Sequence, residues 1–476
     1  MLWLLLVLIV FIFQTGTILL FEFRKPSKAV AWLFILFCFP LIGFVVYYFV
    51  AQDYQKRKMV RKGGSQLFRE FRERLWAQSK VIEQVEQMHN PHFKHQERLF
   101  NQLIRMSENP LTGCNRTRVL TNGEETFEAM LIAMENAQHH IHVEFYIFRA
   151  DEIGRKFQEV MIRKAREGVK VRFVVDGVGS YHLPYSFIRT CSEAGVEFHY
   201  FLPPFFATLD RRINYRNHRK IVVVDGVIGF VGGINVGDDY LGKYPKVGFW
   251  RDTHLQIEGD SVYFLQNAFL SDWKLASGER LMDVNLFPPH TCTGDEEVQI
   301  LSSGPDQVWD TIQEMCFGAL TVAKKRIWIT TPYFIPDLGI YEALKLAAVS
   351  GVDVKIIIPY QSDSKLVHLA SLSYVQELLE AGVEFYQYRK GFIHAKVVIV
   401  DDLLGSVGTA NMDMRSFFYN FELTAIVFAN SALERLSEDF VEDISNSSRI
   451  DLNVFRRRPR SQKIAEILTR MLSPLL

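Results

Sequence analysis

The residues HRKIVVVDGVIGFVGGIN at 218–235 return, with the same spacing, as HAKVVIVDDLLGSVGTAN at 394–411. In both copies a His-x-Lys pair is followed after four residues by Asp, and after six more by Gly-x-x-Asn. A single histidine is usually a core or surface residue without a chemical role. Two copies of the whole pattern in corresponding places therefore indicate a duplicated domain that carries chemistry.

The surrounding sequence repeats in the same order. AGVEFHYF at 194–201 recurs as AGVEFYQY at 381–388, and the apolar runs VKVRFVVD at 169–176 and VDVKIIIP at 352–359 precede them. Continuous β-branched runs are typical of strands buried on both faces of a sheet. The sequence predicts an α/β protein with mixed sheets flanked by helices. Two tandem domains, at 111–289 and 295–452, are expected to form one active site related by a pseudo-twofold axis.

The His-x-Lys pairs predict the nature of the site. Residues two apart on a strand point to the same face, so His218 would lie beside Lys220, and His394 beside Lys396. Each strand end then brings a glycine, which permits close backbone approach, and an asparagine, whose amide can bind an oxyanion. A diester phosphate needs a nucleophile, positive charge for its oxygens and an acid for the leaving alkoxide. The two pairs together supply all three.

The N-terminus has no charge over residues 2–21 or over residues 29–51. Both stretches reach the roughly 20 residues that span a bilayer as helix, so a transmembrane hairpin is expected over residues 1–52. The alternative is a cleaved signal peptide, which would need a basic start and a small-residue cleavage site that the first stretch lacks. Nine basic residues against three acidic ones between positions 51 and 80 favour a catalytic body on the cytoplasmic side.

Residues 53–110 are polar and are interpreted as a basic helical connector, whereas residues 453–476 form a basic, amphipathic tail. The tail either lies on the membrane surface or packs on the protein. FLPPFF at 201–206 is either a membrane-dipping segment or a packed loop. Lys+Arg and Asp+Glu balance at 54 each, which argues against a nucleic-acid partner. The five cysteines have no CxxC spacing and indicate neither a disulfide framework nor a zinc site, as is typical of a reducing compartment.

The duplicated HxKxxxxD pattern resembles the phospholipase D superfamily. WRDTHLQIEG at 250–259 and SSGPD at 302–306 resemble, more narrowly, bacterial cardiolipin synthases, over nearly the whole chain. The resemblance implies a multi-pass enzyme of the bacterial cytoplasmic membrane that needs no metal or cofactor. It would perform phospholipase D-type transphosphatidylation, converting two phosphatidylglycerols into cardiolipin and glycerol through a phosphohistidine. One departure is that some relatives have Ser after the motif glycine, where this chain has Gly233 and Thr409.

The resemblance also implies roles for individual residues. His218 would attack phosphorus and His394 would act as acid and base, although the symmetric sequence itself does not choose between them. Each histidine would be oriented by a carboxylate, which points to Asp252 and Glu422; otherwise these two are ordinary buried acids. The full candidate set is: catalytic His218, Lys220, Asp225, His394, Lys396 and Asp401; phosphate-binding Asn235 and Asn411, together with both lysines. Asp225 and Asp401 end their strands and are expected to brace the fold rather than touch substrate.

Three alternatives are kept beside this interpretation. A membrane phospholipase D or a phosphatidylserine synthase would use the same scaffold with water or serine as acceptor. An inactive lipid-binding scaffold would be expected to have lost a motif His or Lys, and both motifs are intact. A nuclease would be expected to carry an extended basic groove.

The basic stretch after residue 51 would attract phosphatidylglycerol and other anionic phospholipids. The sequence gives no indication of the oligomeric state.

Overall fold

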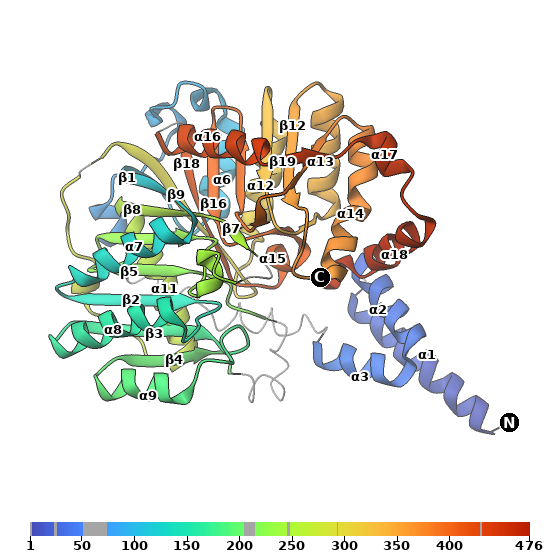
Figure 1. Ribbon diagram of the computed structural model, residues 1–476, viewed down its shortest axis with the longest axis horizontal. Helices are drawn as coiled ribbons and strands as arrows, with labels where there is room; N and C mark the ends of the chain where they lie inside the picture. Colours follow the sequence, from blue (N-terminus) through green and yellow to red (C-terminus); the bar gives the residue numbers. More distant parts are fainter. Residues whose placement is uncertain are drawn as a thin grey trace.

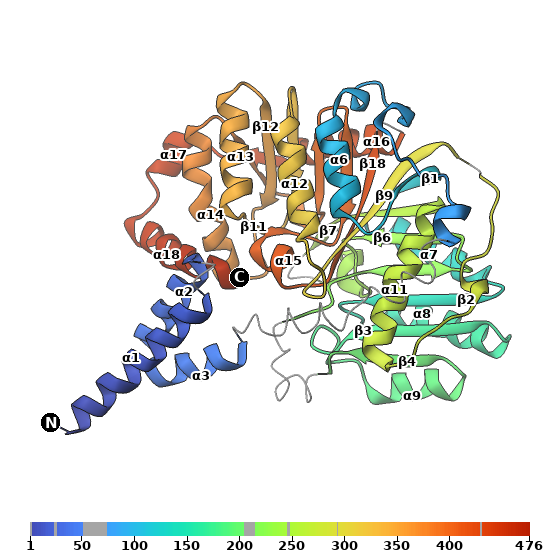
Figure 2. The same cartoon turned by 180° about the vertical axis from the view of Figure 1, so that it is seen from behind.

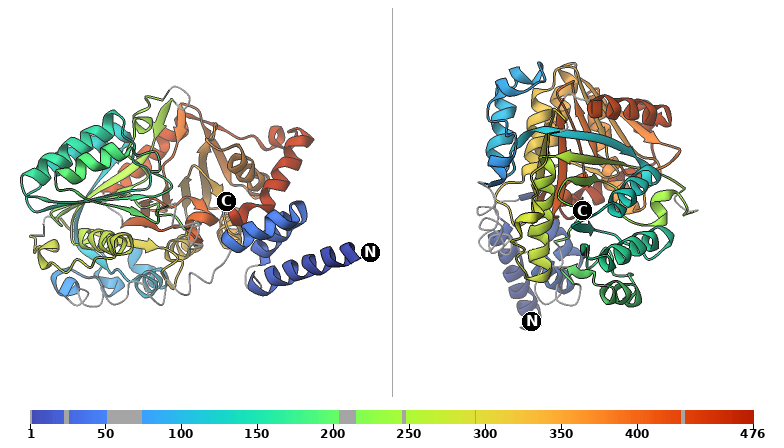
Figure 3. Two further views of the ribbon diagram at one scale, coloured as in Figure 1. Left: turned by 90° about the horizontal axis from the view of Figure 1, so that it is seen from below. Right: turned by 90° about the vertical axis from the view of Figure 1, so that its left-hand side faces the viewer.

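The computed structural model of the protein describes residues 2–22, 26–50, 74–203, 215–244, 248–292, 294–428 and 431–476. Figures 1 and 2 show the fold from its two sides, and Figure 3 shows the sheet from below and from one end. Helices lie on both faces of a mixed sheet, and a separate group of N-terminal helices projects from one corner. The predicted α/β class is confirmed.

The sheet proves the duplication. Its fifteen strands follow the order β19-β13-β12-β10-β15-β16-β18-β9-β1-β8-β6-β5-β2-β3-β4, so each half repeats one strand order outward from the β9–β1 pair at the centre. The first half contains β1 (Leu111–Thr121), β2 (His140–Phe145), β3 (Lys170–Asp176), β4 (Glu197–Phe201), β5 (Ile221–Val224), β6 (Ile228–Gly232) and β8 (Thr253–Gly259). The second half contains β9 (Glu296–Ser303), β10 (Arg326–Thr330), β12 (Asp353–Pro359), β13 (Glu384–Tyr388), β15 (Val397–Val400), β16 (Leu404–Gly408), β18 (Glu422–Phe428) and β19 (Ser447–Arg449).

The helices repeat in the same way. In the first half α7 (Asn122–Glu135), α8 (Glu152–Arg166) and α9 (Tyr185–Glu193) cover one face and α11 (Ser261–Ser277) covers the other. Their counterparts in the second half are α12 (Thr311–Val322), α13 (Leu338–Val349), α14 (Lys365–Glu380) and α16 (Ser431–Ser445). Gly168 and Gly351 follow α8 and α13 with φ of 97° and 90°, a conformation that glycine adopts without steric cost.

The two halves share one hydrophobic core. Ile221 and Leu255 of the first half belong to the same buried cluster as Val298, Ile399 and Ala425 of the second. Burial of this apolar surface fixes the position of one half against the other. Segments that are far apart in the sequence are thereby held at a common boundary, where the candidate site lies.

The N-terminus differs from the prediction. The first stretch forms one helix, α1 (Leu2–Glu22), as expected. The prediction of a single helix over residues 29–51 is wrong, because two helices, α2 (Pro26–Cys38) and α3 (Pro40–Val50), take its place. Pro40 has no N–H to donate, so it interrupts helical hydrogen bonding, and the rings of Trp32 and Tyr47 pack 5.4 Å apart as α2 and α3 fold on each other. Among the helices in the described part of the chain, none is both long enough and apolar enough to cross a membrane.

The connector and the tail pack around the second half. The described part of the connector contains η1 (Val85–Gln87), η2 (Phe93–His95) and α6 (Glu97–Met106); residues 51–73 lie outside the described residues. The tail forms α17 (Leu452–Arg456), α18 (Arg460–Met471) and η5 (Ser473–Leu475), and α18 packs on α14. An ion pair of 2.9 Å joins Arg470 to Glu377 at this contact. Of FLPPFF, Phe201 is buried, while residues 204–206 lie outside the description.

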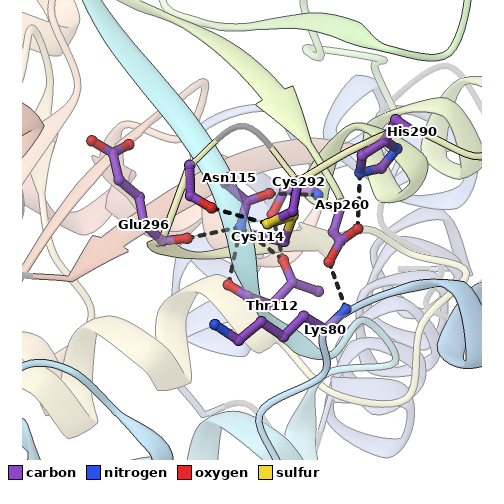
Figure 4. The surroundings of a disulfide bond; sticks show 10 residues. Lys80, Thr112, Cys114, Asn115, Asp260, His290, Cys292 and Glu296 are labelled. Carbon is purple, nitrogen blue, oxygen red and sulfur yellow. Dashed lines mark hydrogen bonds and ion pairs between the residues drawn. A yellow bond between two sulfur atoms is a disulfide. The ribbon is translucent and has the colours of Figure 1, made fainter.

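The cysteine prediction is wrong at one pair. Cys114 on β1 and Cys292 in the segment between the halves form a disulfide across a sequence separation of 178 residues, with 5.4 Å between their Cα atoms (Figure 4). Local CxxC spacing carries no information about a pair of this kind, because only the tertiary fold brings the two segments together. Cys38, Cys191 and Cys316 are free thiols.

Candidate active site

A cavity of about 540 Å³ lies between the two halves and contains both motif histidines. Its walls come from both copies of the domain: Tyr146, Asn235 and Trp250 line it from the first half, and Tyr333 and Asn411 line it from the second. A single ligand in this space can therefore contact groups from both halves. This arrangement is the shared site that the duplicated motif predicts.

Each histidine is paired with the carboxylate of the opposite half. His218 Nδ1 lies 2.9 Å from Glu422 Oε2, and His394 Nδ1 lies 2.7 Å from Asp252 Oδ2. Both carboxylates are fully buried. A carboxylate accepts the Nδ1 hydrogen and so fixes the tautomer, which leaves Nε2 with a free lone pair. The sequence identified the four residues, but it did not indicate that the pairs cross.

Backbone contacts between the halves explain the crossing. The His218 N–H donates to Phe421 O at 2.9 Å, and the His394 N–H donates to Arg251 O at 2.7 Å. These carbonyls belong to the residues just before the two orienting carboxylates, so each carboxylate is delivered next to the opposite histidine. The second contact continues a short parallel pairing of β7 (Phe249–Arg251) with β14 (Gly391–Ile393).

The His-x-Lys residues themselves lie just before a strand, not on it. β5 begins at Ile221 and β15 at Val397, because the preceding backbone bonds to the opposite half instead of a sheet neighbour. The side chains still alternate as predicted. Lys220 Nζ donates to the backbone oxygen of His218 at 2.6 Å, whereas the intervening Arg219 points away and contacts Asp272 at 2.7 Å.

The residues after the motif glycines explain the departure noted in the sequence. Thr409 Oγ1 donates a hydrogen bond to Glu422 and accepts one from the Leu423 N–H at 2.9 Å. In the first copy a Cβ atom at Gly233 would lie 2.1 Å from Asp252 Oδ1, so only glycine leaves room for that carboxylate. Aspartate is one carbon shorter than glutamate. The missing side chain at position 233 lets its backbone approach the shorter acid closely.

Burial keeps the histidines neutral. Desolvation lowers the pKa of His218 to about 4, with Glu422 opposing the shift and Lys220 adding to it. Desolvation together with Lys396 likewise lowers the pKa of His394 to about 4. Burial would raise the pKa of Asp252, but His394, Lys396 and the Thr253 N–H together outweigh burial and the pKa falls to about 2. At neutral pH the site thus holds neutral imidazoles beside ionised carboxylates, which is the state that a nucleophile requires.

The two lysines lie behind the histidines and do not line the cavity. Both are buried, and desolvation lowers the pKa of Lys220 to about 7 and that of Lys396 to about 8. Lys396 Nζ lies 2.9 Å from His394 Nε2. An anion in the cavity favours the charged form of both amines.

The remaining predicted residues fall into two groups. Asn235 and Asn411 line the cavity; Asn235 Nδ2 donates to Tyr240 Oη at 2.9 Å, and the buried Asn411 Oδ1 has no hydrogen-bond partner among the described residues. Asp225 and Asp401 lie outside the cavity wall. Asp225 accepts the backbone N–H groups of residues 138–140, and Asp401 accepts those of residues 324–326, in the same way. Both have a positive φ, of 54° and 51°.

Several lining residues were not singled out from the sequence. Tyr146 and Tyr333 occupy corresponding places in the two repeats, and this correspondence was the available signal. No signal in the sequence marked two other lining residues, Arg415 on α15 (Met414–Phe418) and the C-terminal residue Leu476. Leu476 reaches the cavity because η5 packs against both α15 and α2. Among the described residues, the only group of three or more His, Cys, Asp or Glu side chains close enough to hold a metal ion is Cys114, Asp260 and His290, none of which lines this cavity.

The duplicated sheet and the two crossed His–carboxylate pairs in one cavity define a phospholipase D-like protein. The family model "Cardiolipin synthase, PLD-like domain" matches residues 130–245 and 317–444. Together with the curated relatives described next, this match shows that the chain belongs to the cardiolipin synthase family of phospholipase D-like enzymes. As a member of that family it is a phosphatidyltransferase.

The curated relatives match nearly the full length. The cardiolipin synthase of Geobacillus sp. (strain WCH70) is 46% identical over 461 residues, which are 96% of this chain and 90% of that protein. Cardiolipin synthase 2 of Bacillus anthracis is 44% identical over 98% of this chain and 90% of that protein. Among solved structures, phosphatidylserine synthase of Haemophilus influenzae Rd KW20 superposes with a TM-score of 0.61 at 13% identity, over 80% of this chain and 100% of that one. That likeness concerns the fold alone.

Proposed function

We propose that this protein makes cardiolipin by transferring a phosphatidyl group from one phosphatidylglycerol to another, with release of glycerol. The observation that carries the proposal is the single cavity in which His218 and His394 meet, each held by the carboxylate of the other half. The names of the full-length relatives supply the substrate class. Both substrates are phospholipids, and the reaction exchanges one phosphodiester for another.

The first step uses the free Nε2 lone pair of His218. It attacks phosphorus, the P–Nε2 bond forms, and the bond from phosphorus to the headgroup glycerol breaks. An anionic phosphate beside His394 favours its protonated form, and this imidazolium gives its proton to the departing glycerol oxygen. Asp252 and Glu422 stabilise the positive charge that develops on the two rings.

The second step reverses these roles. Neutral His394 removes the proton from a glycerol hydroxyl of the second phosphatidylglycerol. That oxygen attacks phosphorus, the P–Nε2 bond breaks, and His218 returns to its neutral state. Lys220, Lys396, Asn235 and Asn411 are proposed to stabilise the phosphate oxygens, the lysines from behind the histidines through their charge. Asp225 and Asp401 are proposed to brace the fold through their backbone hydrogen bonds.

Expression in bacteria that lack cardiolipin tests the activity. We expect cardiolipin in lipid extracts from the wild type and none from His394→Ala. A matched control is His182→Ala, since this histidine is exposed and lies outside the cavity. Purified enzyme given only phosphatidylglycerol should yield cardiolipin and glycerol in equal amounts. Formation of phosphatidic acid without cardiolipin would contradict the proposal and show that the protein is a phospholipase.

The proposed location is the bacterial cytoplasmic membrane, with the N-terminal region as a multi-pass anchor and the catalytic body on the cytoplasmic side. Uncharged stretches at 2–21 and 29–51 support the anchor. Exposed apolar side chains on α1 to α3 and on the neighbouring α18 support contact with lipid: Ile9, Ile12, Phe13, Leu20, Phe37, Ile42, Ile464 and Ile467. Anionic phospholipids are the proposed partners of the basic residues at 51–80.

Thiol labelling tests this location. Glu193 is exposed on α9, a helix that lies far from the N-terminal helices in Figure 1. Glu193→Cys can be placed in a Cys38→Ser background. A membrane-impermeant maleimide should label position 193 only after the cells are opened. Labelling in intact cells would place the catalytic body outside the cell. Release of the protein from membranes by alkaline carbonate would contradict the proposed membrane anchor.

A further inference from the structure

A second cluster of reactive side chains lies apart from the catalytic cavity, where four segments meet (Figure 4). Cys114 comes from β1, Asp260 from the residue before α11, and His290 and Cys292 from the segment that joins the two halves. Lys80, at the end of the connector, contributes a backbone N–H that donates to Asp260 Oδ2 at 2.6 Å. None of the four side chains has a part in the proposed reaction.

The donor atoms of this cluster converge. One ligand atom each from Cys114, Asp260 and His290 lie within 4.8 Å of one another. His290 Nε2 is 3.0 Å from Asp260 Oδ1, and the sulfur of Cys292 is bonded to that of Cys114. Cys114 and Asp260 are buried, and His290 Nδ1 is buried without a hydrogen-bond partner among the described residues.

These four side chains are of the types that bind zinc. Zn²⁺ in structural sites is tetrahedral and takes thiolate, imidazole and carboxylate ligands. Ligand distances of about 2.0–2.3 Å place tetrahedral donors roughly 3.3–3.8 Å apart, and the donor atoms of Cys114, Asp260 and His290 already lie within 4.8 Å of one another. The Lys80 N–H already holds the carboxylate oxygen that would not face the metal, as outer contacts of metal ligands do.

We propose that the reduced protein binds one Zn²⁺ through Cys114, Cys292, His290 and Asp260, and that the disulfide is the oxidised alternative of the same site. Two electrons and two protons from a dithiol break the S–S bond and give two thiols, while the dithiol becomes a disulfide. Zinc then displaces the two thiol protons. Either state ties the joining segment to the first half, so this cross-link persists in a reducing compartment, where disulfides are rare.

Metal content of the full-length protein tests the proposal. The chain is purified in detergent with a dithiol present, incubated with Zn²⁺, desalted and analysed by mass spectrometry for metals. We expect about one zinc per chain in the wild type and at least tenfold less in Cys292→Ser and His290→Ala. Cys191→Ser is the matched control, because it removes a buried thiol elsewhere and should keep the zinc. Zinc-free reduced wild type, or equal zinc in all four proteins, would overturn the site.

Two further measurements separate metal binding from folding and from catalysis. Cobalt in place of zinc should give the thiolate-to-cobalt charge-transfer and visible bands of a tetrahedral site, and Cys292→Ser should lose these bands together with its bound metal. Oxidised protein, in which the Cys114–Cys292 disulfide is resistant to alkylation, should take up no metal. Equal uptake by the oxidised protein would show that the thiolates are not ligands. Cardiolipin formation in Cys292→Ser should stay near the wild-type rate, since this residue is outside the catalytic cavity.

Discussion

Glu422→Gln removes one negative charge beside His218 and also reverses the polarity of one hydrogen bond. Three donors converge on the Glu422 carboxylate: His218 Nδ1–H at 2.9 Å, Asn420 Nδ2 at 3.1 Å and the Thr409 hydroxyl. A glutamine offers one acceptor oxygen and one NH₂ group. Its NH₂ can face His218 only if Nδ1 gives up its hydrogen, and the hydrogen then moves to Nε2, where it blocks the nucleophilic lone pair.

The size of the effect follows from this contact. A buried hydrogen bond to a charged group contributes about 1.5–3 kcal/mol, and the wrong tautomer adds to the loss. A total of about 3–4 kcal/mol corresponds to a decrease in kcat of roughly 10²–10³-fold. KM should change much less, because the amide keeps the shape of the carboxyl group and Glu422 does not itself line the cavity.

The assay is cardiolipin formation from phosphatidylglycerol in mixed micelles, with kcat and KM determined separately. Glu159→Gln, at an exposed position on α8, is the control and should match the wild type. Glu422→Asp keeps the charge but shortens the reach, and should recover part of the lost activity. A Glu422→Gln enzyme within threefold of the wild-type kcat would refute the role of the crossed carboxylate.

Three more predictions concern other parts of the site. Because the free-enzyme pKa of Lys220 is about 7 and that of Lys396 about 8, both cations are lost as pH rises; kcat/KM should fall above this range. The fall in kcat should occur at a pH about one unit or more higher than the fall in kcat/KM, since bound phosphate favours the charged amines. If kcat and kcat/KM fell at the same pH, this prediction would be contradicted. Gly233→Ala should lower activity at least about tenfold, because the new Cβ would displace Asp252; unchanged activity would show that the carboxylate has room. Deletion of residues 473–476 removes Leu476 from the cavity wall and should admit water to the cavity. The ratio of phosphatidic acid to cardiolipin among the products should then rise about threefold or more. An unchanged ratio would show that the tail excludes no water.

The sequence could predict what depends on local pattern and repetition. The two copies of His-x-Lys-x4-Asp-x6-Gly-x-x-Asn gave the duplication, and the β-branched runs gave the α/β class; the structure confirms both. Asp252 and Glu422 were named from a resemblance, but their exchange between the halves depends on the contacts of Phe421 and Arg251 across the boundary. No spacing within one half encodes such contacts.

Other features were beyond a reading of local pattern for the same reason. The Cys114–Cys292 bond joins segments that only the folded sheet brings together. The break at Pro40 was readable in principle, because proline interrupts helical hydrogen bonding, but the prediction rested only on the length and the lack of charge of the stretch. Leu476 lines the cavity only because the tail packs between α15 and α2, which no motif indicates.

A structure of the enzyme with orthovanadate would show whether one phosphate group is held by both halves. We expect one vanadate per chain, with vanadium bonded to Nε2 of one motif histidine and a vanadate oxygen within hydrogen-bond distance of Nε2 of the other, while Glu422 and Asp252 stay on the Nδ1 atoms. Two vanadates bound separately at His218 and His394, or a vanadate that contacts residues of only one half, would contradict the shared site.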